Sequence, residues 1–464
     1  MLIAWLLACP QPEEGLGECA IQRPDPGVLK VEGDRIVDEH GRTTLLRGMN
    51  TGGRSRFAPY MPFYFADEGN LDFDGELVAY AQRLDDWGLN VARVPFSWAA
   101  FEPEPGVWDE GALDRYEALL LALHDKGLWT IPVFHHELYS EGLCGTGFPA
   151  WTLPGSPVEP RRDCRDWFDR YTDDDIAAAY DAFWADEHGA YTAFQAMWDV
   201  VAERFGNVEG VIGFEPLGAP AWGNAVMDDF TEDVLPGLYT DIAAQLAETQ
   251  PDKLFLFGVT PYDAVSGSTG LQPPEGDNLV FAPHYFDRET LAEEPGEVSS
   301  RIEDLEAWAE LGDDWGLPVF VGATGASMES TGALDHARAI YDELDDHGLG
   351  GAWFEYATYE ELWNGVDLSV IGQGGVEREV LDEIVRPYVA HVAGEVQSSS
   401  WDPDTSTWTL TYLADIDGIT ELVLPDRLFA GSWGVSGEGG CVDERADKLY
   451  VRAKSASVTI EVHN

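Results

Sequence analysis

The chain has 464 residues, of which 85 are Asp or Glu and only 27 are Lys or Arg, so its formal net charge is -58. A charge of this size repels the phosphates of nucleic acids and anionic lipid surfaces, which excludes nucleic-acid binding. Hydrophobic residues make up 45% of the chain, with 17 Trp, 17 Tyr and 21 Phe. We therefore expect a globular protein with a full core and an acidic, solvated surface.

A short apolar run opens the chain and ends at Leu6-Leu7-Ala8-Cys9. The run resembles a bacterial lipoprotein signal, although no Lys or Arg precedes it, and it is too short to span a bilayer. The following residues, to about Pro26, are rich in Pro, Gln and Glu, which favours a flexible tether. We predict a signal and tether over residues 1–27, export to the cell envelope or beyond, and either a plain export signal or a membrane tether through a lipidated Cys9.

Four cysteines remain after Cys9: Cys19, Cys144, Cys164 and Cys441. An even number in an exported chain favours disulfides, and the spacing of Cys144 and Cys164 suits the closure of one long loop. Free thiols are the alternative, and the full pairing stays open.

From about Val28 short apolar runs alternate with longer amphipathic stretches, as in repeated βα units. This pattern predicts a (β/α)8 TIM barrel over residues 28–390. An open doubly wound sheet is the alternative, but no glycine-rich phosphate loop follows the first run. The eight expected strands are Thr44–Met49, Asn90–Pro95, Trp129–Phe134, Val211–Leu217, Leu254–Gly258, Leu279–Pro283, Pro318–Ala323 and Gly351–Tyr356. The expected helices include Leu113–Lys126, Ala193–Phe205, Leu235–Thr249, Arg301–Trp315 and Ala333–His347.

Beyond about Arg386 apolar residues alternate with polar ones, for example around Trp408 and again over Val451–Val462. Such alternation is typical of antiparallel strands, so we predict a small β-sandwich over residues 391–464. Its role is either to stabilise the barrel or to bind glycans.

Several short motifs lie where the expected strands end, at the C-terminal face that carries the active site in barrels of this kind. The third strand runs into His135-His136-Glu137-Leu138-Tyr139-Ser140, the sixth into Pro283-His284-Tyr285 and the eighth into Trp353-Phe354-Glu355-Tyr356; earlier come Arg47-Gly48-Met49-Asn50 and Asn90-Val91-Ala92-Arg93-Val94-Pro95. Together these motifs resemble glycoside hydrolase family 5, and within it the endoglycoceramidase group. The resemblance spans roughly residues 28 to 390.

The resemblance implies a retaining hydrolase, in which one glutamate protonates the leaving oxygen and another, about 5 Å away, attacks the sugar. The acid/base of the family follows the fourth strand in Asn-Glu-Pro, where this chain reads Gly218-Ala219-Pro220. The nucleophile of the family lies in Gly-Glu-Phe-Gly on the seventh strand, where this chain reads Gly322-Ala323-Thr324-Gly325. A methyl group can neither donate a proton nor attack carbon, so no catalytic residue is intact at either place.

Three other carboxylates could substitute for the missing pair: Glu137, Glu215 and Glu355. Glu215 lies four residues before Ala219, which on a regular strand is about 13 Å below the catalytic level. Pro216 cannot donate a hydrogen bond to a neighbouring strand, so a local register shift stays open here. For Glu137 and Glu355 we favour hydrogen bonding to substrate over a new catalytic role.

The predicted barrel mouth keeps side chains that suit a pyranose ring, with aromatic faces for C–H patches and polar groups for hydroxyls. We expect no cofactor and no metal, since His135 and His136 point to opposite faces of a strand. A dense aromatic group from Phe57 to Phe65 either rims the site for a lipid tail or packs on its own barrel. The substrate-binding candidates are Asn50, Arg93, His135, Glu137, Trp222, His284, Tyr285, Trp353 and Glu355.

Three functions compete on this evidence. The favoured one is a monomeric, catalytically silent relative that binds a glycan or glycolipid headgroup. The second is an active hydrolase of glycosphingolipids or β-glucosides with relocated carboxylates. The third is a structural or partner-binding surface lipoprotein, which would tolerate changes at Tyr285 and Trp353 without loss of any ligand.

Overall fold

The computed structural model describes residues 15–63, 72–155, 164, 167–292, 296–298, 302–358, 366–415, 417–429, 433–445 and 447–463. The chain divides into two compact units. The barrel unit comprises Pro26–Glu39 and Thr44–Arg386, and the C-terminal unit comprises Pro387–Asn464 with His40–Thr43 and the N-terminal residues up to Asp25.

The barrel unit is a (β/α)8 barrel whose strands pair in parallel in the order β10-β9-β8-β7-β6-β5-β13-β12-β11. The sixth strand of the barrel is interrupted, so β10 (Leu279–Phe281) pairs with β9 while β11 (His284–Tyr285) pairs with β12, which closes the ring. The other strands are β5 (Arg47–Thr51), β6 (Val91–Phe96), β7 (Trp129–His135), β8 (Gly213–Gly218), β9 (Leu254–Phe257), β12 (Phe320–Thr324) and β13 (Gly350–Tyr356). All eight predicted strands are present, and the predicted fold class is confirmed.

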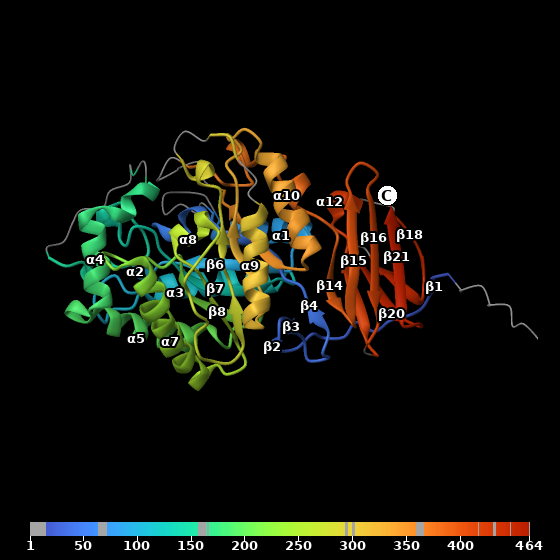
Figure 1. The fold of residues 1–464 in the computed structure, drawn as a ribbon, viewed down its shortest axis with the longest axis horizontal. Coiled ribbons are helices and arrows are strands. Elements are labelled where there is room, and N and C mark those ends of the chain that lie inside the picture. Colours follow the sequence, from blue (N-terminus) through green and yellow to red (C-terminus); the bar gives the residue numbers. More distant parts are fainter. Residues whose placement is uncertain are drawn as a thin grey trace, which may run out of the picture. The chain divides into compact units, whose positions relative to one another are not determined.

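Helices surround the strands, as Figure 1 shows for β6, β7 and β8 at the centre of the barrel. The long helices are α1 (Phe73–Asp86), α3 (Glu110–His124), α4 (Asp174–Trp184), α5 (Ala190–Phe205), α7 (Leu235–Thr249), α9 (Ile302–Trp315) and α10 (Ala333–Asp346). The short helices are α2 (Trp98–Phe101), α6 (Met227–Asp229), α8 (Pro261–Ser266) and α11 (Leu381–Ile384), and a hairpin of β2 (Lys30–Glu32) and β3 (Arg35–Val37) precedes the barrel. The sequence analysis did not predict α1 and α4.

Two apolar layers hold the barrel together. One lies between strands and helices and contains large buried rings such as Trp198, Trp308 and Trp353. The other is a smaller cluster that includes Val91, Leu256, Val280 and Phe320. Near the carboxyl ends of the strands, buried polar side chains follow: Asn50, Arg93, His135, Glu215 and His284. An apolar base with polar groups above it positions a site at the mouth.

The C-terminal unit is a β-sandwich built of antiparallel strands, as predicted. One sheet has the order β15-β16-β21-β18, and in the other β17 joins β14 and β20 while β19 pairs with β20. Trp408, Leu410 and Ile460 are among the residues of its own apolar core. Its strands are β14 (Tyr388–Val392), β15 (Glu395–Asp402), β16 (Thr407–Leu413), β17 (Ile419–Val423), β18 (Gly434–Glu438), β19 (Gly440–Arg445), β20 (Lys448–Ala453) and β21 (Ser457–His463), with a short helix α12 (Asp426–Phe429).

Two disulfides join the four cysteines for which the even count favoured such bonds and the full pairing stayed open. Cys144 is bonded to Cys164 in the barrel unit, and Cys19 is bonded to Cys441 in the C-terminal unit. The second bond corrects the prediction of a flexible tether up to residue 27. Strand β1 (Gly17–Glu18) runs parallel to β19, so this part of the segment is folded onto the sandwich. Cys9 lies outside the described residues.

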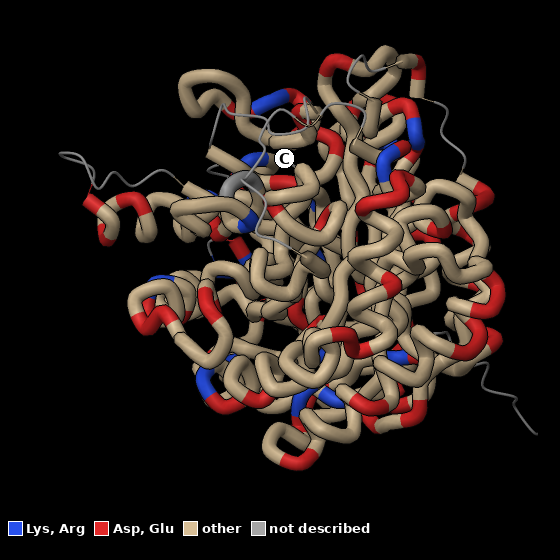
Figure 2. The backbone as a smooth tube through the Cα atoms, turned by 90° about the vertical axis from the view of Figure 1, so that its left-hand side faces the viewer, with Lys and Arg blue, Asp and Glu red and all other residues tan. Residues whose placement is uncertain are grey.

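Acidic positions are spread over the helices and loops of the surface, and basic positions are few (Figure 2). This distribution agrees with a net charge of -58. In the part of the chain that the structure describes, no helix is both long and apolar enough to cross a membrane.

Candidate active site at the barrel mouth

Arg93 on β6 and Glu215 on β8 form a fully buried ion pair in the mouth of the barrel. The guanidinium donates from Nε to Oε2 and from Nη2 to Oε1 of Glu215, both at 2.6 Å. Nη1 donates to Oδ1 of Asn50 at 2.7 Å, and the Asn50 amide donates to the carbonyls of Gly322 and Ala352 at 3.0 and 3.1 Å. The structure brings Asn50 and Arg93, two of the substrate-binding candidates, together, and their hydrogen bonds are made within the barrel.

Strand β8 contains a bulge next to Pro216. Val133 pairs with Glu215 and His135 with Gly218, so three residues of β8 match two of β7. The register shift that proline made conceivable is present, because a residue without an N–H leaves the ladder here. Glu215 consequently lies about 7 Å below Gly218, the rise of two residues rather than three. Measured to Ala219 in the same way, the depth of Glu215 is about 10 Å, the rise of three residues, instead of the about 13 Å of a regular strand.

Gly218 leaves room for the Arg93 guanidinium. A Cβ atom at this position would lie 2.6 Å from Arg93 Nη2, closer than side chains approach one another. The asparagine that the family resemblance places here would thus displace Arg93 or the backbone. The next residue, Ala219, has a left-handed backbone with φ of 69° and is 9% exposed.

Ala323 on β12 lies beside His284 on β11, with which it pairs in register, and it is buried. His284 Nε2 is 3.3 Å from Arg93 Nη2 and 3.9 Å from Glu215 Oε1. The place that the resemblance assigns to the nucleophile therefore has a methyl group next to a histidine whose ring faces the Arg93 pair.

Arg56, the last residue of the 3-10 helix η1 (Gly53–Arg56) after β5, connects Glu137 and Glu355. Its Nη1 donates to Glu137 Oε1 at 2.9 Å, and its Nη2 lies 3.5 Å from Glu355 Oε2. The same Nη1 is 3.3 Å from His135 Nε2. Arg56 is 5% exposed and its guanidinium lies 5.3 Å from the centre of the Phe354 ring. His135, Glu137 and Glu355 thus form one cluster around a residue that the sequence analysis missed.

Two aromatic candidates face away from this cluster. Tyr285 lies 6.0 Å from the ring of His336 on α10, and Trp353 lies 6.2 Å from Tyr341 on the same helix. Both are buried in the layer between strands and helices. The structure therefore corrects the expectation that these two rings line the mouth.

Phe286 and Phe354, one residue further along each strand, are packed near the polar cluster instead. Phe354 stacks on His135 at 5.9 Å and lies 6.2 Å from Phe286. For Phe286, alternation along the strand would have indicated this choice, since His284 and Phe286 share a face. For Arg56 the sequence signal was weaker: it is a basic residue a few positions after a barrel strand, in a chain that has few Lys and Arg residues.

Trp222, in the loop after β8, is half-buried and stacks on Tyr171 at 6.1 Å with an interplanar angle of 23°. It is thus placed beside η4 (Trp167–Thr172), with an exposed part available to a ligand. In the predicted aromatic group, Phe57 and Phe63 are 4% and 1% exposed, which favours packing on the barrel over a lipid rim. Tyr64 and Phe65 lie outside the described residues.

Burial sets the protonation of the mouth. It lowers the pKa of His135 and of His284 well below the usual range, and Arg93 acts in the same direction on both. Burial raises the pKa of Glu137, which Arg56 partly opposes. Both histidines are therefore neutral at pH 7 and can accept or donate hydrogen bonds. Oε2 of Glu137 has no hydrogen-bond partner among the described residues.

His136 does not share a ligand-binding position with His135, because its Nδ1 is 2.9 Å from the Tyr180 hydroxyl. Among the described residues, one group of acidic and histidine side chains has ligand atoms within 4.8 Å of one another: Glu306, Glu343 and His347. These residues lie on α9 and at the end of α10, not at the mouth.

Known proteins share this architecture. The family model for cellulase (glycosyl hydrolase family 5) matches residues 37–360, and the model for the glycoside hydrolase family 5 C-terminal domain matches residues 386–463. Endoglycoceramidase I of Rhodococcus hoagii is 30% identical over 44% of this chain and 39% of its own length. Endoglycoceramidase of Cyanea nozakii is 23% identical over 83% of this chain and 81% of its own length.

Solved structures of endo-glycoceramidase II from Rhodococcus sp. are similar in fold. The complex with a five-membered iminocyclitol has a TM-score of 0.77 at 24% identity and covers 94% of this chain and 99% of that chain. The complex with ganglioside GM3 has a TM-score of 0.76 at 24% identity, over 95% and 99% of the two chains.

Proposed function

Because this chain belongs to glycosyl hydrolase family 5, we propose that it is a catalytically silent, endoglycoceramidase-like member that binds a glycan or glycolipid headgroup at the barrel mouth. The observation behind this proposal is the pair of alanines, Ala219 and Ala323, at the positions that the resemblance assigns to the acid/base and the nucleophile. Without either carboxylate, protonation of the leaving group and the covalent step both lack their residues.

The surroundings of Ala219 support the proposal. A Cβ atom at Gly218 would lie 2.6 Å from Arg93 Nη2, so the asparagine of the family triplet would fit only if the guanidinium moved from its place beside Glu215. The carboxylate of Glu215 receives two donors from Arg93 and is fully buried. A carboxylate held in this way has both oxygens engaged by Arg93 and is not free to turn toward a substrate.

Ligand binding is supported by the polar and aromatic groups that remain. Neutral His135, Glu137 with one free oxygen and the half-buried ring of Trp222 offer the acceptors, donors and aromatic surface that a sugar requires. Similar proteins are named endoglycoceramidases, and one solved relative is a complex with ganglioside GM3. We extend the proposal to a glycolipid sugar such as that of a ganglioside, which this chain, as an exported protein, would bind outside the cell.

The test compares the natural chain with Ala219→Glu/Ala323→Glu, and with Ala219→Gln/Ala323→Gln as a control of equal size without charge. Release of reducing sugar from gangliosides and β-glucosides is measured for all three, and lactose is titrated by calorimetry. We expect turnover in the glutamate variant at most, and millimolar or tighter lactose binding by the natural chain. Turnover by the natural chain, or no binding at millimolar sugar, contradicts the proposal.

A second candidate function is hydrolysis by relocated carboxylates, and Glu137 is the residue that favours it. Its raised pKa and its unpartnered oxygen are properties of a general acid. Turnover that is present in the natural chain and lost in Glu137→Gln would support this candidate function. Turnover that persists in Glu137→Gln would exclude Glu137 as the relocated general acid.

A further inference from the structure

The loop that follows Glu137 has an unusual backbone. Leu138, Tyr139 and Cys144 have φ values of 49°, 75° and 65°, although none of them is glycine. Residues with a Cβ atom are disfavoured in the left-handed region because that atom approaches a carbonyl oxygen. Three such residues within seven positions require the surrounding structure to hold them in place.

The returning side of this loop is bonded to Glu137 itself. Thr146 N–H donates to the Glu137 carbonyl at 2.6 Å, and Glu137 N–H donates to the Thr146 carbonyl at 3.3 Å. Gly145 is packed so closely that a Cβ atom there would lie 2.2 Å from the Glu137 carbonyl oxygen. The backbone position of Glu137 therefore depends on where residues 145 and 146 lie.

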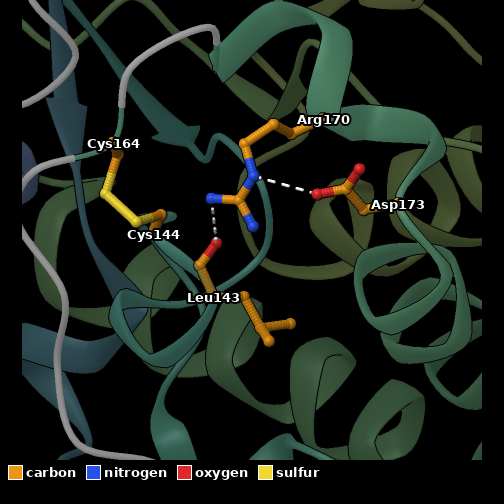
Figure 3. The surroundings of a disulfide bond; sticks show 5 residues. All are labelled: Leu143, Cys144, Cys164, Arg170 and Asp173. Atoms are coloured by element: carbon orange, nitrogen blue, oxygen red, sulfur yellow. Dashed lines mark hydrogen bonds and ion pairs between the residues drawn. A yellow bond between two sulfur atoms is a disulfide. The ribbon is translucent and has the colours of Figure 1, made fainter.

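The residue before this contact is crosslinked. Cys144 is bonded to Cys164, and both are buried, at 4% and 2% exposure. Arg170 secures the same turn, since its Nη1 donates to the Leu143 carbonyl at 3.4 Å while its Nε donates to Asp173 at 2.9 Å. Figure 3 shows Arg170 between the Leu143 carbonyl and the Asp173 carboxylate, with the disulfide beside them.

We propose that the Cys144–Cys164 disulfide, assisted by Arg170, is a positioning device that holds Glu137 against Arg56 for ligand binding. The idea rests on the proposed function for its ligand, but its structural part concerns Glu137 alone. Without the crosslink, the left-handed residues can return to favoured backbone regions, and the backbone at Thr146, which is bridged to Glu137, then moves with them. Glu137 would leave the Arg56 cluster, enter water and bind sugar poorly.

The chain offers a matched control, because its second disulfide lies in the other compact unit. We compare Cys144→Ser/Cys164→Ser with Cys19→Ser/Cys441→Ser, which removes the bond in the C-terminal unit. Lactose affinity is measured by calorimetry. Titration of Glu137 is followed by carboxyl NMR, with the Glu137→Gln spectrum used to assign its signal.

We expect the first variant to bind lactose at least tenfold more weakly and the second to stay within twofold of the natural chain. The raised pKa of Glu137 should fall toward the ordinary glutamate value in the first variant only, a change that general loss of stability would not produce in folded protein. Arg170→Gln should change lactose affinity and the pKa of Glu137 in the same direction by a smaller factor. If the double variant does not fold, Arg170→Gln serves as the test of the positioning role.

Unchanged lactose affinity and an unchanged Glu137 titration in the first variant and in Arg170→Gln would overturn the positioning role. If the natural chain binds no lactose, the proposed function fails, and the Glu137 titration still tests the positioning role separately.

Discussion

Removal of the Glu215 carboxylate would leave the Arg93 guanidinium fully buried without its anion. In Glu215→Leu, Arg93 keeps its contact with Asn50 but loses two hydrogen bonds of 2.6 Å each. Breaking a buried ion pair from one side costs about 3–5 kcal/mol, since an uncompensated charge stays in the protein. For a unit of this size a loss of about 4 kcal/mol corresponds to a fall in Tm of about 5 °C.

The assay is urea unfolding of natural chain and variant, with the free energy of unfolding extrapolated to water. A second variant, Arg93→Met/Glu215→Leu, removes both charges and should recover most of the loss, because no unpaired ion remains. Arg204→Met is the surface control, since Arg204 pairs with Glu117 at 2.8 Å but is 34% exposed, and it should cost less than about 1 kcal/mol. A loss below about 1 kcal/mol in Glu215→Leu would refute our account of the pair.

Three further outcomes are expected. Salt should stabilise the protein, because a charge of -58 repels itself over a Debye length of about 10 Å at 0.1 M ionic strength and about 3 Å at 1 M; a Tm that does not rise in NaCl contradicts this. Burial lowers the pKa of His136 to about 3. As pH falls, His136 is therefore protonated in the unfolded chain before it is protonated in the folded chain, and the free energy of unfolding decreases below about pH 6.5. This loss is about 1.4 kcal/mol per pH unit down to about pH 3, and His136→Gln should reduce the slope of stability against pH by that amount. Ala219→Gly should raise the free energy of unfolding by about 0.5–1 kcal/mol, because glycine adopts a φ of 69° freely, whereas Ala122→Gly in α3 should lower it by about 1 kcal/mol.

The strands could be predicted because each is a short apolar run bounded by polar residues, and their number and spacing define a barrel. Helix α4 was missed because a long loop precedes it, and its pairing with η4 and α5 depends on tertiary contacts. The fold of residues 17 and 18 onto β19 was unpredictable for a similar reason, since the Cys19–Cys441 bond spans 422 positions of the sequence. Composition alone cannot identify a partner so distant in the chain.

For the site, the sequence identified residues but not the direction of their side chains. His135, Glu137 and Glu355 were found, and the structure groups them, but Arg56 at their centre lies in η1, whose position no periodicity determines. Tyr285 and Trp353 were chosen because large aromatic rings suit sugars. Alternation along β11, which places Phe286 on the face of His284, is the stronger rule there. In β13 the consecutive residues Phe354 and Glu355 both lie beside Arg56, so alternation does not decide the face.

The bulge in β8 bears on our proposal that Ala219 and Ala323 stand where the family has its carboxylates. It raises Glu215 toward the mouth, which by itself would favour a relocated catalyst. At this height, however, Glu215 pairs with Val133 and accepts hydrogen bonds from Nε and Nη2 of Arg93. Gly218, which follows on the same strand, leaves the space that the Arg93 guanidinium occupies. A carboxylate that turned from Arg93 to a substrate would leave a buried guanidinium without its anion. If this chain hydrolyses sugars with a relocated carboxylate, the Arg56 cluster is therefore a better candidate than β8, because Oε2 of Glu137 has no hydrogen-bond partner among the described residues.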